Sequence, residues 1–152
     1  SKDEKKRHIE KIANDNVDIN ALSMYTLGNI RKTLDEDTKE KYKNLFKQYL
    51  LKSLSSRLSD YSDQKFEVIN SEQKSATLTI VNSRIVESTS QPEIKIDWRV
   101  YTKDPSKPLI RDLIIEGLSL ARTQKEEFAS ILNSNNNDIN ILILKLEEFV
   151  NN

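Results

Sequence analysis

The 152-residue sequence contains no cysteine, only two glycines, three prolines and a single histidine. The lack of cysteine excludes disulfide bonds, thiol nucleophiles and thiolate metal ligands. With two glycines, the chain has no glycine-rich loop of the kind that cradles a phosphate group. His8 has no partner at metal-binding spacing in the sequence, so we interpret it as an exposed residue without a catalytic or metal-binding role.

Charge and hydropathy exclude further classes of protein. Lysine plus arginine and aspartate plus glutamate both number 24, so the net charge is zero and the sequence lacks the electrostatic signature of nucleic-acid binding. Hydrophobic residues make up 36% of the chain, and no apolar run approaches the roughly 20 residues that a membrane span requires. The chain begins at Ser1 without a methionine or the apolar segment of a signal peptide, and we interpret it as a trimmed or mature form.

The length of the chain predicts a single domain over residues 1–152 with a substantial core. Residues 1–14 are mostly charged and predict a solvated N-terminal helix or arm. Apolar residues at steps of three and four predict helices within residues 18–61, the first of them opened by an N-cap at Asp18. Gly28 lies inside that predicted helix, which suggests that another element packs closely against it.

Residues 64–116 alternate between apolar and polar side chains and predict an antiparallel sheet. The clearest strand contains Trp98, and turn-forming residues at 104–108 separate it from the next strand. The apolar phase changes near Asn82–Arg84, which we interpret as a bulge or a bend. The spacing then becomes helical, and it predicts C-terminal helices within residues 118–150.

Helices followed by consecutive strands are typical of the α+β class. We expect a curved antiparallel sheet of about four strands with helices packed on one face, similar in appearance to nuclear transport factor folds. The long helix expected within residues 38–61 carries one apolar stripe. Such a stripe is either part of the core or one wall of a cavity.

The stretch from Trp98 to Phe128 resembles the signature of a known family. The residues that carry the resemblance are Trp98, Asp112, Glu116-Gly117-Leu118-Ser119-Leu120, Thr123-Gln124 and Glu127-Phe128. They are similar to MlaC-like proteins, periplasmic phospholipid carriers also called toluene-tolerance auxiliary proteins. With Val17-Asp18-Ile19 and Leu27-Gly28, the resemblance spans roughly residues 17–146. The chain departs from the family pattern at Asn29-Ile30, Lys125 and Asn135 to Asn137.

This resemblance implies a soluble periplasmic carrier that holds a phospholipid by its acyl chains in an apolar cavity. It also implies two partners, an outer-membrane lipoprotein and porin complex and an inner-membrane ABC transporter complex, between which the lipid is shuttled to maintain outer-membrane lipid asymmetry. A diacyl lipid in water exposes about thirty methylenes at about 0.8 kcal/mol each, so such a carrier must shelter them. Charged residues around 103–111 are a candidate docking surface.

We predict that apolar side chains of the helices and the sheet line the cavity. The predicted lining residues are Leu27, Leu45, Tyr49, Leu50, Leu54, Leu58, Leu78, Ile80, Ile94, Ile96, Trp98, Val100, Leu113, Ile115, Leu118 and Phe128. A filled core demands the same residue types, so the sequence leaves both arrangements open. The alternative function is a non-enzymatic α+β domain with a filled core that binds another protein through its sheet.

Residues for catalysis are scarce. The best pair of acid–base groups is Asp112 and Glu116, which we place on one strand face. Capping of backbone groups, or pairing with Arg84, Arg99 or Arg111, is the simpler interpretation of these two carboxylates. We therefore predict a binding protein without enzymatic activity, whose only ligand is a phospholipid and which holds no metal or other cofactor.

Overall fold

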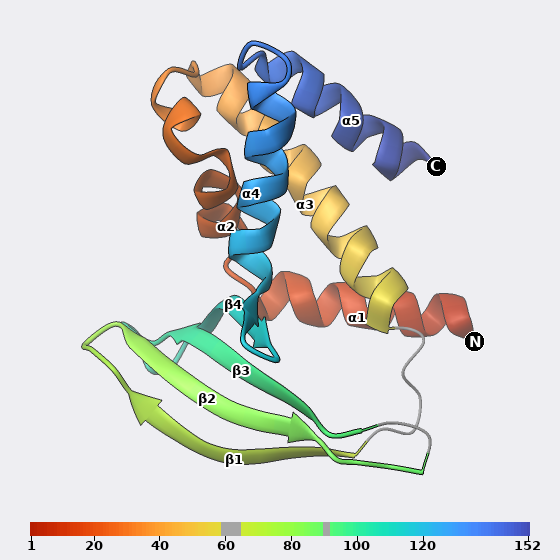
Figure 1. Ribbon diagram of the computed structural model, residues 1–152, viewed down its shortest axis with the longest axis vertical. Helices are drawn as coiled ribbons and strands as arrows, with labels where there is room; N and C mark the ends of the chain where they lie inside the picture. Colours follow the sequence, from red (N-terminus) through yellow and green to blue (C-terminus); the bar gives the residue numbers. More distant parts are fainter. Residues whose placement is uncertain (59–64, 90–91) are drawn as a thin grey trace.

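The computed structural model describes residues 1–58, 65–89 and 92–152, in which helices and strands occupy separate blocks of the chain. The elements in order are α1 (Lys2–Asn16), α2 (Ile19–Leu27), the 3₁₀ helix η1 (Gly28–Lys32), α3 (Glu36–Leu58), β1 (Phe66–Gln73), β2 (Leu78–Ile85), β3 (Ile94–Tyr101), β4 (Leu109–Ile115), β5 (Leu118–Ser119), α4 (Leu120–Asn133) and α5 (Ile139–Asn151). The helices form a layer on one side of the strands (Figure 1). The predicted α+β class is confirmed.

The mostly charged N-terminal segment forms the helix α1. The Ser1 side chain accepts a hydrogen bond from the backbone N–H of Glu4, and the Glu4 side chain reaches back to Ser1, which closes a capping box. This helix packs along α3, where Ser55 Oγ donates to Glu10 Oε1 at 3.2 Å and Ala13 is buried. Residues 2–16 therefore belong to the helical layer.

The second helix begins where the sequence predicts and ends earlier. Asp18 caps α2 by accepting a hydrogen bond from the backbone N–H of Ala21 at 3.2 Å. The prediction that Gly28 lies inside this helix is wrong, because α2 ends at Leu27 and Gly28 has a φ of 61°. Only glycine adopts that backbone region without strain. A Cβ on Gly28 would lie 3.5 Å from Lys125 Cε, so the expected close neighbour is present.

The hydrophobic core lies between α2, α3, α4 and α5. Its buried residues are Ile19, Leu27, Tyr42, Leu45, Phe46, Phe128, Leu132, Ile139, Leu142, Ile143 and Leu146. Tyr42 is completely buried, and its hydroxyl lies 2.7 Å from Thr26 Oγ1. Burial raises the pKa of Tyr42 and the hydrogen bond with Thr26 opposes that rise, so the phenol stays neutral. The predicted apolar stripe of the long helix is thus largely a core surface, and residues 59–61 of the expected helix lie outside the described residues.

The sheet is antiparallel, with its five strands in sequential order from β1 to β5. We expected about four strands, and β5 is an additional strand of two residues. The helix expected from residue 118 begins at Leu120, because Leu118 and Ser119 pair with β4 and Ser119 then caps α4. An irregularity lies near the expected place, because the β1–β2 register shifts opposite Asn82 and Ser83. The extra residue is Ile69 of β1, and the β2–β3 register is unbroken.

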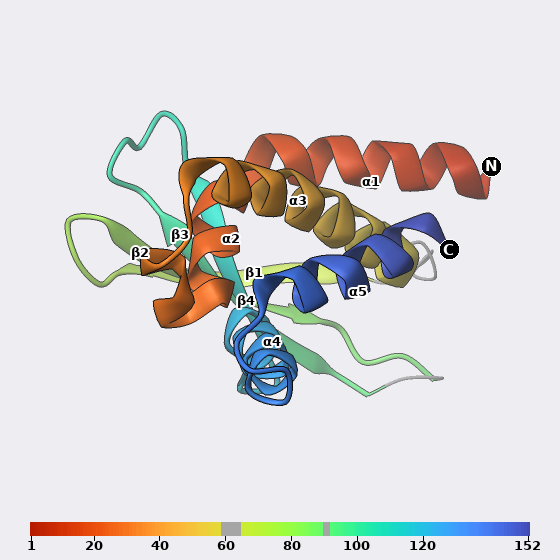
Figure 2. The same ribbon diagram turned by 90° about the horizontal axis from the view of Figure 1, so that it is seen from above.

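The helical layer contacts the sheet mainly at the edge formed by β4 and β5. The backbone N–H of Asp18 donates to the carbonyl oxygen of Ile110 at 2.8 Å, and Arg111 Nε donates to Asp18 Oδ2 at 3.0 Å. Among the strands, β4 packs against α4 and α2, and β5 packs against α4. In contrast, every residue of β1 is exposed. Figure 2 shows the helices from above, with the strands extending beyond them.

Candidate functional site

The register of the strands gathers apolar side chains on one face of the sheet. Directly paired residues of neighbouring strands point to the same face. The face that carries Trp98 also carries Phe66, Val68, Val81, Ile85, Ile94, Ile96, Val100, Ile110, Leu113, Ile115 and Leu118. We call this set the apolar sheet face.

Two of the predicted lining residues lie on the opposite face. Leu78 pairs with Tyr101, and Ile80 pairs with Arg99. The prediction that they share a face with Trp98 is wrong, because the residue opposite Trp98 is Val81 and side chains alternate along a strand. The opposite face is mostly polar, and Arg84 forms ion pairs there with Glu67 at 2.8 Å and Glu93 at 2.9 Å.

None of the residues of the apolar sheet face is buried. On β2, β3 and β4 they are half-buried. Toward the margins the exposed fraction rises to 49% at Phe66, 62% at Val68 and 58% at Leu118. This continuous half-exposed apolar surface is the candidate site, because monomeric proteins seldom leave large apolar patches open without a binding role.

The predicted lining residues of the helices belong mostly to the helical core. Leu27, Leu45 and Phe128 are buried in it, and Tyr49 and Leu50 pack against it. The Tyr49 hydroxyl donates to Gln124 Oε1 at 2.9 Å, which fixes α3 against α4. Leu54 on α3 is half-buried, and the side chain of Leu58 lies outside the described residues. The predicted residues of β3 and β4 therefore share one face of the sheet, whereas most of those on the helices lie in or against the helical core.

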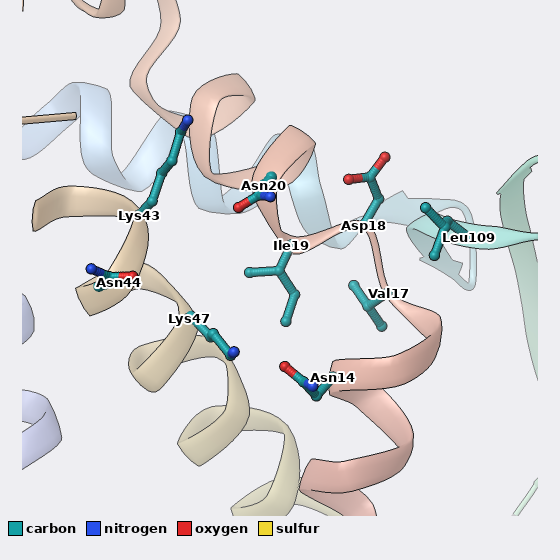
Figure 3. A pocket seen from close by; sticks show the side chains of 9 residues that line it. All are labelled: Asn14, Val17, Asp18, Ile19, Asn20, Lys43, Asn44, Lys47 and Leu109. Carbon is teal, nitrogen blue, oxygen red and sulfur yellow. The ribbon is translucent and has the colours of Figure 1, made fainter. Parts of the chain in front are cut away.

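A separate hollow of about 300 Å³ lies between α1, α2, α3 and the start of β4 (Figure 3). It is lined by Asn14, Val17, Asp18, Ile19, Asn20, Lys43, Asn44, Lys47 and Leu109, and none of the predicted cavity residues is among them. Several of these side chains carry amide or ammonium groups. Hydrocarbon in this hollow would remove water from them, so the hollow is poorly suited to an acyl chain.

The two candidate acid–base carboxylates have structural partners. Asp112 accepts hydrogen bonds from the backbone N–H of Ala121 at 3.0 Å and from the Ser119 hydroxyl, at the start of α4. Glu116 accepts one from the backbone N–H of Lys95 at 2.7 Å. The capping interpretation of Asp112 is therefore confirmed.

The described residues lack two further features. Over residues 1–58, 65–89 and 92–152, no group of three or more histidine, cysteine, aspartate or glutamate side chains is arranged to hold a metal ion. Within the same ranges, no helix combines the length and apolar character that crossing a membrane requires.

The sequence as a whole matches the family model described as MlaC protein over residues 1–148. The chain belongs to the MlaC family. This result confirms the resemblance that the residues between Trp98 and Phe128 carry, and it extends over almost the entire chain.

A solved structure shares the MlaC-family fold of this chain. It is the phospholipid-binding protein from Ralstonia solanacearum, in complex with a phospholipid. The two sequences are 19% identical, the TM-score is 0.77, and the alignment covers 95% of this chain and 82% of that chain. At this level of identity the likeness concerns the fold. No curated protein sequence matches this chain.

The MlaC-like motif residues hold the last strands to α4. Asp112 and Ser119 order the first turn of the helix, Gln124 binds Tyr49 of α3, and Phe128 fills the helical core. Gly117 has a φ of 82°, which suits the tight turn between β4 and β5. In this member of the MlaC family, the motif therefore positions the helical layer over β4.

Sequence reasoning missed several members of the apolar sheet face. The predicted lining omits Phe66 of β1 and Val81 and Ile85 of β2. The alternation within β2 indicates that Val81 and Ile85 share a face, so the sequence contains a signal for these two residues. Ser83 was also missed: it is 1% exposed and lies on the same face. A serine in a polar stretch gives no sign of burial, because its surroundings come from other strands.

Proposed function

We propose that this chain is a phospholipid-binding protein and that its apolar sheet face holds the acyl chains. The observation that carries this proposal is the half-exposed state of that face, which spans β1 to β5 beside a helical layer with its own closed core. Membership of the MlaC family and the shared fold with the Ralstonia solanacearum phospholipid-binding protein support an acyl chain as the occupant.

The energetics favour a lipid on this surface. Complete burial of a valine, leucine, isoleucine or phenylalanine side chain contributes about 1.5–3 kcal/mol. The helical core already gains this stabilisation, whereas the residues of the apolar sheet face gain only part of it. An acyl chain laid across the face removes apolar area of both molecules from water. A charged head group keeps its hydration if it stays at the margin.

The proposal includes a carrier role in the periplasm. The bound phospholipid would pass between an outer-membrane lipoprotein and porin complex and an inner-membrane ABC transporter complex, which maintains the lipid asymmetry of the outer membrane. The family resemblance supports these partners. The exposed loop at residues 103–108 is a candidate docking surface for one of them. The function is binding and transfer, without chemical change to the lipid.

Native mass spectrometry after gentle purification tests the central part of the proposal. The expected spectrum contains a species heavier than the bare chain by the mass of one phospholipid, and lipid extraction identifies it. Protein stripped of lipid should regain this mass after incubation with phospholipid vesicles and separation from them. A chain that neither carries phospholipid nor takes it up would contradict the proposal and favour a protein-binding role for the sheet.

The carrier role requires a second measurement. Lipid-loaded protein is mixed with acceptor vesicles, and the labelled phospholipid in each fraction is measured over time. Transfer that increases with protein concentration supports carriage. Stable retention of the lipid in the presence of vesicles would restrict the function to binding.

A further inference from the structure

The indole of Trp98, the only tryptophan of the chain, has its polar atom bonded inside the protein. Trp98 Nε1 donates to Ser83 Oγ at 2.8 Å, and Ser83 Oγ donates to the carbonyl oxygen of Ile96 at 2.6 Å. The N–H of the indole and the O–H of the serine therefore both have protein acceptors. Neither of these two donors requires water.

The small size of Ser83 permits this arrangement. Ser83 lies on β2, between Val68 of β1 and Ile96 of β3 in the register. The indole extends over it toward β1, where its ring centroid lies 6.0 Å from that of Phe66 at an interplanar angle of 87°. This cover explains why Ser83 is 1% exposed although the apolar residues around it are half-buried or exposed.

The internal hydrogen bond indicates what kind of molecule the surface accepts. A tryptophan at an aqueous surface can leave its N–H to water, whereas one beneath hydrocarbon needs a partner within the protein. Trp98 has such a partner in Ser83, and the donors of this pair are not available to recognise a polar ligand. Val81 and Leu113 lie opposite Trp98 on the two neighbouring strands, so the indole is surrounded by apolar side chains.

We propose that Trp98 is a binding residue whose indole contacts an acyl chain, and that Ser83 is the positioning residue that holds the indole against the sheet. This inference rests on the proposed function and deepens it by naming the contact point. The acyl chain lies over Trp98 near the centre of the apolar sheet face, and Phe66 borders the contact on the β1 side.

The single tryptophan makes the contact measurable by fluorescence. The protein is loaded from vesicles of palmitoyl-oleoyl phosphatidylcholine, with the oleoyl double bond intact in one preparation and brominated in the other. After the vesicles are removed, Trp98 emission is compared between the two samples, and native mass spectrometry quantifies the bound lipid in each. Because bromine quenches indole emission only at short range, we expect lower emission with the brominated lipid at equal loading.

Variants of the serine test its positioning role. Ser83→Ala removes the acceptor of the indole N–H, and we expect less quenching and about fivefold weaker lipid binding, which corresponds to ~1 kcal/mol for one hydrogen bond. Ser83→Cys replaces the hydroxyl with a slightly larger group that is a weaker acceptor and should give an intermediate result. Ser23→Ala is the matched control, because Ser23 is also a buried serine with a hydrogen-bonded hydroxyl but lies on α2 instead of the sheet, so quenching and lipid binding should not change. Thermal unfolding verifies that each variant folds.

The possible outcomes separate the two proposals. Equal emission with intact and brominated lipid, in protein that mass spectrometry shows to be loaded, overturns the Trp98 contact and leaves phospholipid binding in place. Unchanged quenching in folded Ser83→Ala overturns the role of Ser83. A protein that takes up neither lipid contradicts both the contact and the proposed function.

Discussion

The helical layer and the sheet use the same residue types in different ways. In the helical layer, Tyr42 and Leu142 are 0% exposed and the core closes on itself. On the apolar sheet face, Ile96 and Trp98 are half-buried, and Val68 is 62% exposed. The helical core stabilises the fold without help from most of the sheet. This difference in burial supports the binding role proposed for the apolar sheet face.

Removal of a core side chain should have the largest effect on stability. Leu142→Ala leaves a cavity in the helical core and is expected to lower the free energy of unfolding by about 2–5 kcal/mol. Ile96→Ala is the counterpart on the sheet, and its cost should be less than half as large because Ile96 already contacts water. Urea denaturation of the two variants measures both values. Equal costs would mean that the sheet face is a filled core and would remove the distinction between the regions.

A charge on the apolar sheet face should affect lipid binding strongly. Ile96→Asp is expected to fold and to bind phospholipid at least about tenfold more weakly, because hydrocarbon would have to displace water from the new carboxylate. The matched control is Ile80→Asp, which places the same charge on the opposite face of the neighbouring strand. Mass spectrometry of vesicle-loaded protein measures uptake by each variant. Equal losses in the two variants would show that the face does not determine where lipid binds.

The smallest expected effect is at the exposed start of α3. Hydrogen bonds from the side chain and backbone of Thr38 lower the pKa of Asp35 below its ordinary value of 3.8. The unfolded chain therefore binds more protons than the folded one between these two pKa values. The stabilisation by Asp35 is complete above pH 3.8 and is lost as the pH falls through the lowered folded pKa.

Asp35→Asn tests this dependence, since asparagine also caps helices but does not titrate. The difference in unfolding free energy between the two proteins should shrink as the pH falls below 3.8. Urea denaturation at a series of pH values measures it. A constant difference across the series would show that the Asp35 carboxylate does not contribute through its charge.

Local patterns in the sequence predicted the elements well where the signal was itself local. The N-cap at Asp18 is confirmed, because a capping side chain bonds to residues within its own first turn. The alternation of β3 placed Ile94, Ile96, Trp98 and Val100 on one face, as the register shows. The motif between Trp98 and Phe128 indicated the MlaC family correctly.

Predictions that depended on partners from other elements were less accurate. Leu78 and Ile80 were placed on the wrong face because the alternation within one strand does not show which residues oppose the next strand. Leu27 and Phe128 lie in the helical core, and hydrophobic spacing alone does not distinguish a core residue from a cavity wall. Gly28 was assigned to a helix interior, since a positive φ leaves no mark on hydrophobic spacing.

The sequence by itself determined most of the helices and strands, which family the chain belongs to, and that thiol chemistry is excluded. Only the tertiary structure decided which apolar residues are buried in the helical core and which remain open on the sheet. It also decided that Ser83 accepts a hydrogen bond from the indole of Trp98. The physical reason is that periodicity depends on neighbours along the chain, whereas burial and hydrogen-bond partners depend on strand register and on where the helices pack.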